Sequence, residues 1–544
     1  MNEPNWAAPL AAAAKAHEEG RLPEAEERLR TLLRDLGARE PVRPVPVLLR
    51  LAGVLVARGE FERAYAIADE AAAIAPADPL ALNLRASALG LLGRRAEAEA
   101  AFRAALARDP ELVEAHFNLG RLLAGQGRNA EAAIAFRAAL DLAPDAAPPR
   151  RALAAALRDE GRFDEALAEL DRAAGAGEPG PDLRNERGIL QVMAGRLDAA
   201  IADFDAALAA RPDFVAPRFN RSLALLRQGD FRRGWTEYEH RFRTDMVRPM
   251  PFTQPRWRGE PIAGRTIVLW GEQGHGDSLQ FVRYASLVAD RGARVVVIAQ
   301  TALQRLLRSV AGVDRVVEPG QPVGPHDLHA PLMGLPELFG TTVETIPATV
   351  PYLAPDAEAR ARWAGRIPDR GRLRVGLVWA GDARPHLAMS NATDRRRSVR
   401  LERLAPLFGV TEVDFVSLQF GARGRDRQGQ PFADRMLDPM GEVRDFADTA
   451  AIVEQLDLVV TVDTAMAHLA GALGRPVWVL SRFDGCFRWL TDREDSPWYP
   501  TMRLFRQTTS LDWERPIRQV AAALADLAGR GRPGRNDGRA TAAA

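Results

Sequence analysis

A glycine that returns every 34 residues constrains this chain more than any other feature of its sequence. The glycines in phase are Gly59, Gly93, Gly127, Gly161, Gly195 and Gly229. A small residue follows each at the same offset, at Ala64, Ala98, Ala132, Ala166, Ala200 and Gly234, and proline recurs in step at Pro76, Pro110, Pro144 and Pro212, with Pro179 one place out of register. Each unit therefore predicts a helix, a glycine turn, a second helix and a proline stop. Because one such hairpin cannot bury its apolar face alone, neighbouring hairpins must stack.

This period and pattern resemble the tetratricopeptide repeat. We expect about six repeats over residues 45–240, forming an α-solenoid, and a degenerate hairpin around Gly20 and Ala25, within residues 1–44, that caps it. The resemblance implies a concave groove that binds a peptide or protein. Asn118, Asn185 and Asn220 would hydrogen-bond an extended backbone in that groove, or else simply cap or solvate their helices.

The second half of the chain has a different pattern. Residues 241–262 are rich in proline, arginine and aromatic residues and are interpreted as a connector. Short apolar runs then alternate with amphipathic stretches, in a first group TIVLW, RVVVIA, RVVE and DLHA and a second group RVGLVWA, VDFVSL, DLVVTV and PVWVLS. Such runs predict parallel strands buried on both faces. The two groups predict two Rossmann-like halves, residues 263–360 and 370–528, facing a cleft, and a disordered tail over residues 529–544.

Three loops at predicted strand ends carry residues suited to chemistry. The first, GEQGHGD, follows strand TIVLW and opens a helix; Gly274, His275 and Gly276 form its loop, and Asp277 stands at the helix start, where it is a candidate for catalysis or merely a cap.

The second loop follows strand DLVVTV and opens another helix. Asp463 ends the strand, Thr464, Ala465 and Met466 begin the helix, and His468 lies one turn in. Free amides and a hydroxyl at a helix N-terminus form a diphosphate site. His468 belongs to that site or is a hydrogen-bonded structural residue.

The third loop, WAGDARPHLAMSNATDRRRSVRLERL, supplies Arg395, Arg396, Arg397 and Ser398. Because the chain has almost no lysine, phosphate contacts must fall to arginine, helix ends or backbone amides. The alternative is a solvated basic loop. Gln419 ends strand VDFVSL, where it would meet a ribose or base. Asp445 and Asp448 would cap a helix, the interpretation we favour, or face the cleft. No residues have metal-ligand spacing, so no metal is expected.

Together, the strand, glycine-rich loop and Gly-Asp at residues 266–277 and the run VDTAMAHLAGALGRPVWVL resemble the heptosyltransferases, glycosyltransferase family 9-like bacterial enzymes. The resemblance spans residues 262–528, and Ala465 stands where that family typically has glycine. It implies a GT-B fold and metal-independent, inverting transfer of a sugar from a nucleotide-sugar substrate, with no cofactor.

In the scheme that the resemblance implies, Asp277 is the general base, and Arg396 or Arg397 with the helix start at Thr464 hold the donor diphosphate. The acceptor would be a glycan or a protein recruited by the repeats. The alternative function is a non-catalytic scaffold with a degenerate transferase domain. The sugar, the nucleotide and the acceptor stay open.

Composition excludes several classes of protein. A net charge of +1 gives no reason to expect nucleic acid or an anionic membrane as partner. The single cysteine, Cys486, excludes an intramolecular disulfide and a cysteine-rich zinc site and fits a reducing compartment. No apolar run approaches the roughly 20 residues of a membrane span. The expected location is the cytoplasm.

Overall fold

The computed structural model describes residues 6–37, 44–175, 179–245, 247–272, 274–384 and 388–531. The chain divides into two compact units, Met1–Glu178 and Pro179–Ala544. The predicted tail beyond residue 531, Gln273 of the first loop and residues 385–387 of the third lie outside the described residues. The predicted domain borders stay predictions.

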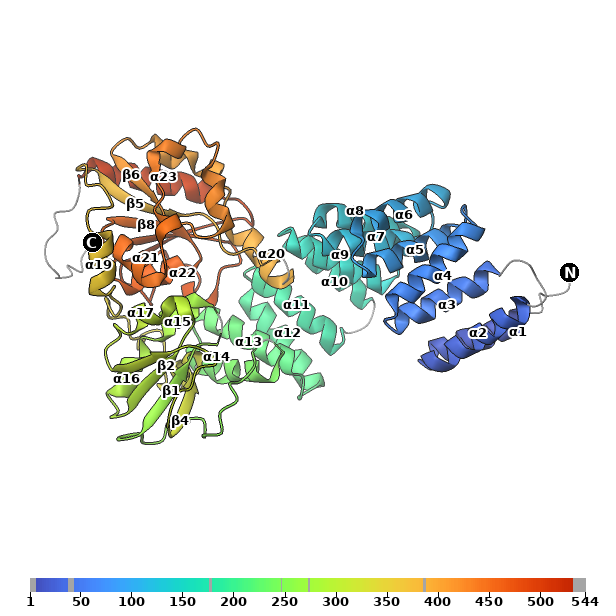
Figure 1. Cartoon of the computed structure of the whole chain (residues 1–544), viewed down its shortest axis with the longest axis horizontal. Coiled ribbons are helices and arrows are strands. Elements are labelled where there is room, and N and C mark those ends of the chain that lie inside the picture. Colours follow the sequence, from blue (N-terminus) through green and yellow to red (C-terminus); the bar gives the residue numbers. More distant parts are fainter. Residues whose placement is uncertain are drawn as a thin grey trace. The chain divides into compact units, whose positions relative to one another are not determined.

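The first unit is a stack of helical hairpins (Figure 1). Its helices are α1 (Ala7–Glu18), α2 (Leu22–Gly37), α3 (Val45–Ala57), α4 (Phe61–Ile74), α5 (Pro79–Leu91), α6 (Arg95–Arg108), α7 (Val113–Gly125), α8 (Asn129–Leu142), α9 (Ala147–Asp159) and α10 (Phe163–Ala174). Gly59, Gly93 and Gly127 each adopt a φ of 77°, the left-handed conformation that favours glycine. The α-solenoid prediction is therefore confirmed, down to the turn residue.

Small residues let the paired helices approach closely. Ala64, Ala98 and Ala132 are each 0% exposed. Between α7 and α8, a Cβ added at Gly120 would lie 2.5 Å from the Phe136 ring, so the phenylalanine fills the space that the glycine leaves. Volume matching of this kind fixes the angle within each hairpin.

The last two hairpins belong to the second unit, with the sheets. They comprise α11 (Pro181–Met193), α12 (Leu197–Ala210), α13 (Val215–Gln228) and α14 (Phe231–Tyr238), followed by the 3-10 turn η1 (Glu239–Arg243). Trp235 of α14 is 2% exposed and makes edge contacts with Phe281 and Phe487, which lie in the α/β part of the unit. These repeats therefore share a core with the sheets.

Asparagines pair between neighbouring repeats inside each unit. Asn118 Nδ2 donates to Asn83 Oδ1 at 3.4 Å in the first unit, and Asn220 Nδ2 donates to Asn185 Oδ1 at 2.9 Å in the second. Of the three asparagines predicted to bind a peptide, Asn185 and Asn220 therefore hydrogen-bond each other, and Asn118 hydrogen-bonds Asn83 of the preceding repeat. Their binding of a peptide stays a prediction.

Two parallel sheets form the α/β part of the second unit. The first has the order β3-β2-β1-β4 and the second the order β10-β9-β8-β5-β6-β7. The strands are β1 (Thr266–Trp270), β2 (Arg294–Ile298), β3 (Val313–Val317), β4 (Leu328–Pro331), β5 (Leu373–Val378), β6 (Val413–Ser417), β7 (Met436–Leu437), β8 (Leu458–Val462), β9 (Val477–Ser481) and β10 (Met502–Arg506). Every predicted strand is present, and the parallel α/β architecture is confirmed.

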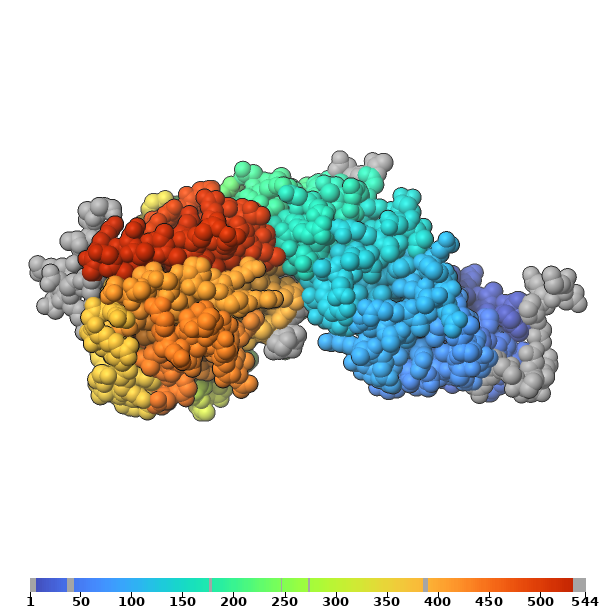
Figure 2. Space-filling view, turned by 90° about the horizontal axis from the view of Figure 1, so that it is seen from above, coloured from blue at the N-terminus to red at the C-terminus, as the bar shows by residue number. Residues whose placement is uncertain are grey.

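Short helices cover these sheets, and α23, red in Figure 2, lies on the surface of the second sheet's half. The α-helices are α15 (His275–Phe281), α16 (Tyr284–Ala289), α17 (Gln304–Leu307), α18 (Leu335–Leu338), α19 (Ala357–Trp363), α20 (Ala388–Arg397), α21 (Phe446–Val453), α22 (Ala465–Ala472) and α23 (Glu514–Gly529). The 3-10 turns are η2 (Thr301–Leu303), η3 (Leu332–Gly334), η4 (Leu401–Gly409), η5 (Ala422–Arg427), η6 (Ala433–Arg435), η7 (Met440–Glu442) and η8 (Phe487–Trp489).

Strand order creates one crevice in each sheet. From β5 the chain proceeds to β6 and β7 on one side, and from β8 to β9 and β10 on the other. From β1 it proceeds to β2 and β3, then returns to β4 on the opposite side. Ligands of open α/β sheets bind beyond the carboxyl ends of strands at such reversals. The loops after β5 and β8, and the loop after β1, are therefore the places to look for a site.

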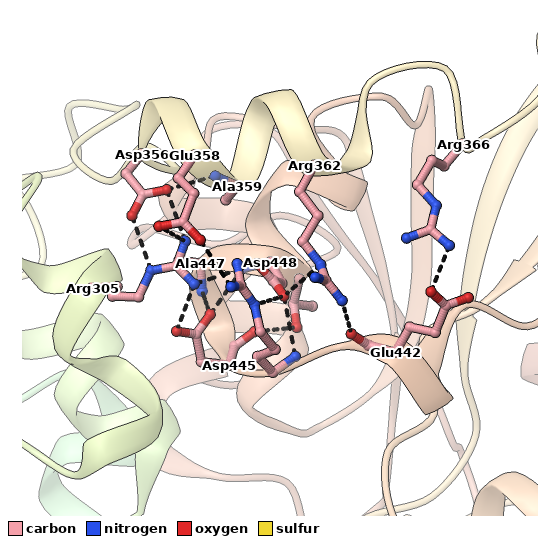
Figure 3. A network of polar contacts seen from close by, with 12 residues as sticks. Arg305, Asp356, Glu358, Ala359, Arg362, Arg366, Glu442, Asp445, Ala447 and Asp448 are labelled. Atoms are coloured by element: carbon pink, nitrogen blue, oxygen red, sulfur yellow. Dashed lines mark hydrogen bonds and ion pairs between the residues drawn. The ribbon is translucent and has the colours of Figure 1, made fainter.

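A network of ion pairs joins the two halves at one edge (Figure 3). Arg305 of α17 pairs with two carboxylates. Asp356, the residue before α19, lies 2.9 Å away, and Asp445, the residue before α21, lies 3.1 Å away. Asp445 also caps α21, as predicted, by accepting from the amide of Ala447 at 3.0 Å. Asp448 differs from its predicted capping role: its side chain is 0% exposed and pairs with Arg444 at 2.9 Å. Arg305 and its partners thus tie the first sheet's half to the second.

Candidate functional site

The candidate site lies at the crevice between β5 and β8. Its first wall is the loop after β5, residues 379–384, and its second is the end of β8 with the start of α22. The residues that end α20 connect the two walls. Ser398 Oγ accepts from the amide of Gly381 at 3.0 Å, and Arg397 donates to the carbonyl of Asp463 at 3.4 Å. Three predicted residues, Arg397, Ser398 and Asp463, are thus brought together.

Arg397 lies directly against the backbone of the loop after β5. A Cβ added at Gly381 would lie 2.3 Å from one Arg397 nitrogen and 2.2 Å from Asp394 Oδ1, so only glycine fits here. Asp394 holds the guanidinium at 3.0 Å, yet 27% of the Arg397 side chain stays exposed. Arg397 therefore presents a fixed, accessible cation in the crevice.

The start of α22 supplies the opposite wall. Thr464 is the N-cap, and its Oγ accepts from the amide of Met466 at 3.3 Å. The hydroxyl of Thr461, at the end of β8, contacts Thr464 Oγ at 3.2 Å and fixes its orientation. The amides of Ala465 and the next residues form the positive end of the helix dipole, which favours an anion.

Two residues that were predicted to contact the sugar-nucleotide donor, Arg396 and Gln419, are buried behind the crevice. Arg396 is 6% exposed, and its Nε donates to Asp484 at 3.0 Å. Gln419 is 4% exposed; its Oε1 accepts from the amide of Ala380 at 2.9 Å, and its Nε2 donates to the Ala380 carbonyl at 3.0 Å. Of the two arginines that the resemblance offers, Arg397 is therefore the accessible one. Gln419 holds the loop after β5 in shape.

His468 lies in the interior. Its Nδ1 is 3.0 Å from the Tyr499 hydroxyl, and its ring stacks on Trp489 with centroids 5.4 Å apart. Burial, with Arg488 and Arg283 nearby, lowers the pKa of His468 well below its ordinary value, so the ring is neutral. This geometry fits the hydrogen-bonded structural role that the sequence left open.

The loop after β1 contacts the start of α22 from the first half. Gly274 is the N-cap of α15, and a Cβ at Gly276 would lie 2.9 Å from His468 Cδ2. Asp277 Oδ2 accepts from the amide of Gly274 at 2.9 Å, and Asp277 Oδ1 pairs with Arg488 of η8. Asp277 thus both caps α15 and forms an ion pair across the two halves.

Sequence reasoning missed a buried polar cluster behind the crevice, formed after β9. Asp484 accepts from Arg396 and, at 2.6 Å, from Arg482; Arg227 of α13 donates to the carbonyl of Phe483 at 3.2 Å. Although burial opposes it, the arginines hold the pKa of Asp484 below its ordinary value. The signal was present in the sequence, since RFDGCFR directly follows a buried strand, where charged side chains belong to a site or its support.

No helix in the described part of the chain combines the length and apolar character that a membrane crossing needs. Among the same residues, no group of three or more histidine, cysteine, aspartate and glutamate side chains could hold a metal ion.

Comparison with protein families identifies the repeats. Residues 83–147, 151–213 and 185–233 match the tetratricopeptide repeat family. The helical hairpins within residues 83–233 are therefore tetratricopeptide repeats.

One curated relative is similar over a longer stretch. Protein FlbA of Caulobacter vibrioides is 27% identical over 348 residues, which cover 58% of this chain and 56% of FlbA. The chain thus spans little more than half the length of this relative.

Solved repeat proteins are similar to the array. A tetratricopeptide repeat protein from Parabacteroides merdae is 21% identical, with a TM-score of 0.34, covering 43% of this chain and 91% of its own. Another from Thermus thermophilus is 27% identical, with a TM-score of 0.28, covering 34% of this chain and 100% of its own.

Proposed function

We propose that the chain is an inverting glycosyltransferase of the GT-B type, which transfers a sugar from a nucleotide-sugar without a metal. The observation that carries the proposal is the position of Arg397 between the loop after β5 and the end of β8, beside the α22 N-terminus. A fixed guanidinium next to a helix start suits the diphosphate of a leaving nucleotide, because both stabilise the negative charge that develops as the sugar departs.

The acceptor would approach from the first half of the unit. The start of α15 abuts the start of α22 at Gly276, so groups on the first turn of α15 would lie next to the proposed diphosphate site. An acceptor hydroxyl needs a base to take its proton as it attacks the anomeric carbon. His275 and Asp277 are the two titratable groups on that turn.

The tetratricopeptide array would recruit the acceptor, either a protein or a glycan. We further propose a cytoplasmic location, which fits a nucleotide-sugar substrate and a single cysteine. A second candidate function is a non-catalytic scaffold. One observation favours it: the carboxylate expected to act as base, Asp277, is already paired with Arg488.

Replacing Arg397 by methionine is expected to weaken binding of the donor nucleotide about 10- to 100-fold, the effect of losing a charged hydrogen bond. Isothermal titration of the full chain with uridine, guanosine, adenosine and cytidine diphosphates, and with their sugar derivatives, measures this. Arg400→Met is the matched control, because the Arg400 side chain is 80% exposed and lies 3.9 Å from Glu402. Equal affinities for both variants, or no binding by the unsubstituted chain, would contradict the proposal.

A further inference from the structure

Asp277 already uses both carboxylate oxygens. Oδ2 accepts from the Gly274 amide at 2.9 Å, and Oδ1 pairs with the Arg488 guanidinium. Arg488 is itself 8% exposed, and its Nε donates to Gln280 Oε1 at 2.5 Å. Burial opposes its charge, but Cys486 and Asp277 together hold the pKa of Arg488 above its ordinary value. For Asp277 to take a proton, this buried cation would lose its carboxylate partner, which costs several kcal/mol.

His275 lies on the same turn and faces the second half. Its ring centroid is 5.2 Å from that of Phe446, the first residue of α21, and Arg384 of the loop after β5 acts on its charge. The side chain is half-buried. Among the described residues, its ring nitrogens make no hydrogen bond. A neutral imidazole here has a nitrogen lone pair available to an incoming hydroxyl.

Charged groups around His275 favour the neutral ring. Burial, followed by the positive charge of Arg384, lowers the pKa of His275 below its ordinary value. Asp445 and Asp448, next to Phe446 on α21, are engaged by Arg305 and Arg444, and Asp277 on its own helix is engaged by Arg488. None of the three carboxylates is therefore left to stabilise an imidazolium in the resting site.

The position of the ring links it to the donor crevice. The neighbouring Gly276 would place a Cβ 3.4 Å from Ala465 Cα, the first residue of α22. His275 therefore lies on the turn of α15 that meets the helix start suited to a diphosphate, with its ring beside Phe446 of α21. We propose that His275, rather than Asp277, is the general base of the transfer, an inference that rests on the proposed function.

An acceptor hydroxyl oxygen forms a bond to the anomeric carbon while the bond from that carbon to the diphosphate oxygen breaks, and its electron pair leaves with the nucleoside diphosphate. The hydroxyl proton passes to a ring nitrogen of His275, and the imidazolium then returns it to water. With water as the acceptor, the same step is hydrolysis of the nucleotide-sugar. Asp277 acts as a positioning residue that holds α15 on η8.

The test measures nucleoside diphosphate release from a panel of nucleotide-sugars by the full chain, with water as acceptor. His275→Gln is expected to lower kcat at least about 100-fold, the contribution of a general base, with donor Kd within about threefold. The acid limb of the pH profile of kcat/KM, set by the neutral ring, is expected to disappear. The matched control is His326→Gln, which replaces a loop histidine that contacts Phe252 and is expected to leave kcat unchanged. Asp277→Asn is expected to lower Tm and to keep more activity than His275→Gln.

Three results would overturn the inference. If His275→Gln keeps kcat within about threefold with the acid limb intact, His275 is not the base, although the transferase function stands. If the unsubstituted chain releases nucleoside diphosphate from no donor, both the inference and the proposed function fail. Histidine NMR gives a readout independent of turnover: the signal lost in His275→Gln is expected to titrate below pH 6.5, and titration above that value contradicts the proposal.

Discussion

Replacing Arg241 by alanine is expected to lower the free energy of unfolding of the second unit by about 3–5 kcal/mol, the cost of breaking a buried ion pair from one side. Arg241 follows the last repeat, and its Nε and second terminal nitrogen donate to Glu272, in the loop after β1, at 2.6 and 2.9 Å. Both side chains are 0% exposed. Urea denaturation followed by tryptophan fluorescence measures the loss, because Trp235 and Trp270 lie in this unit.

A double variant tests whether the loss of stability comes from the unpaired charge that Arg241→Ala leaves on Glu272. Arg241→Met combined with Glu272→Leu removes both charges and leaves neither uncompensated, so its stability is expected to lie near that of the unsubstituted chain. Loss of stability in the double variant equal to that of Arg241→Ala would contradict the ion-pair explanation.

Stability of Arg241→Ala is expected to depend on pH in a defined direction. Burial raises the pKa of Glu272 even with Arg241 in place. A carboxyl whose folded pKa lies above its unfolded value binds its proton first in the folded state, so stability rises as pH falls through the folded pKa. The deficit of the variant is therefore expected to be largest at neutral pH and smaller in mild acid.

Asp484→Asn is expected to cost about 3–5 kcal/mol and to weaken donor binding as well. Asp484 is the carboxylate that faces Arg396 and Arg482, and Arg227 from the repeat helix α13 adds to the positive charge around it. Removing its charge raises the repulsion among buried guanidinium groups. Since Arg396 precedes Arg397 on α20, the disturbance reaches the crevice. Denaturant titration and donor titration measure the two effects.

A surface carboxylate provides the control. Asp495 pairs with Arg493 at 2.6 Å, but its side chain is 69% exposed, so Asp495→Asn is expected to cost less than about 1 kcal/mol. The folded pKa of Asp484 is lowered, so its contribution to stability is present above the unfolded pKa and is lost as pH falls through the folded pKa. In Asp484→Asn, the free energy of unfolding is therefore expected to fall less steeply as the pH is lowered into the acid range. An equal cost for both variants would contradict the buried-cluster account.

Sequence patterns predicted the helical hairpins and most of the strands because these elements depend on residues close together in the chain. The repeat glycines form the turn of each hairpin, and the buried alanines allow its two helices to pack closely. The eight apolar runs predicted as strands are all strands in the structure. The two strands that were missed lie at the sheet edges. β7 has two residues, and β10 carries an exposed Arg503, so neither forms a fully apolar run.

Long-range pairing was beyond the reach of the sequence. Arg488 and Asp277 are 211 residues apart, and no local pattern announces that their charges meet. Likewise, Arg241 reads as part of a connector, although it is buried against the loop after β1. The loops to search could be named in advance because the carboxyl ends of parallel strands meet at one edge of a sheet. The order of the strands and the partner of each charged side chain depend on tertiary packing.

The most direct test of the account is release of nucleoside diphosphate when the full chain is incubated with a panel of nucleotide-sugars, followed with the anomeric configuration of the released sugar. An inverting transferase of this kind is expected to release nucleoside diphosphate from at least one donor, to depend on Arg397 for that release, and to invert the anomeric configuration of the sugar. No release from any donor, or release with retained configuration, would contradict the proposed function.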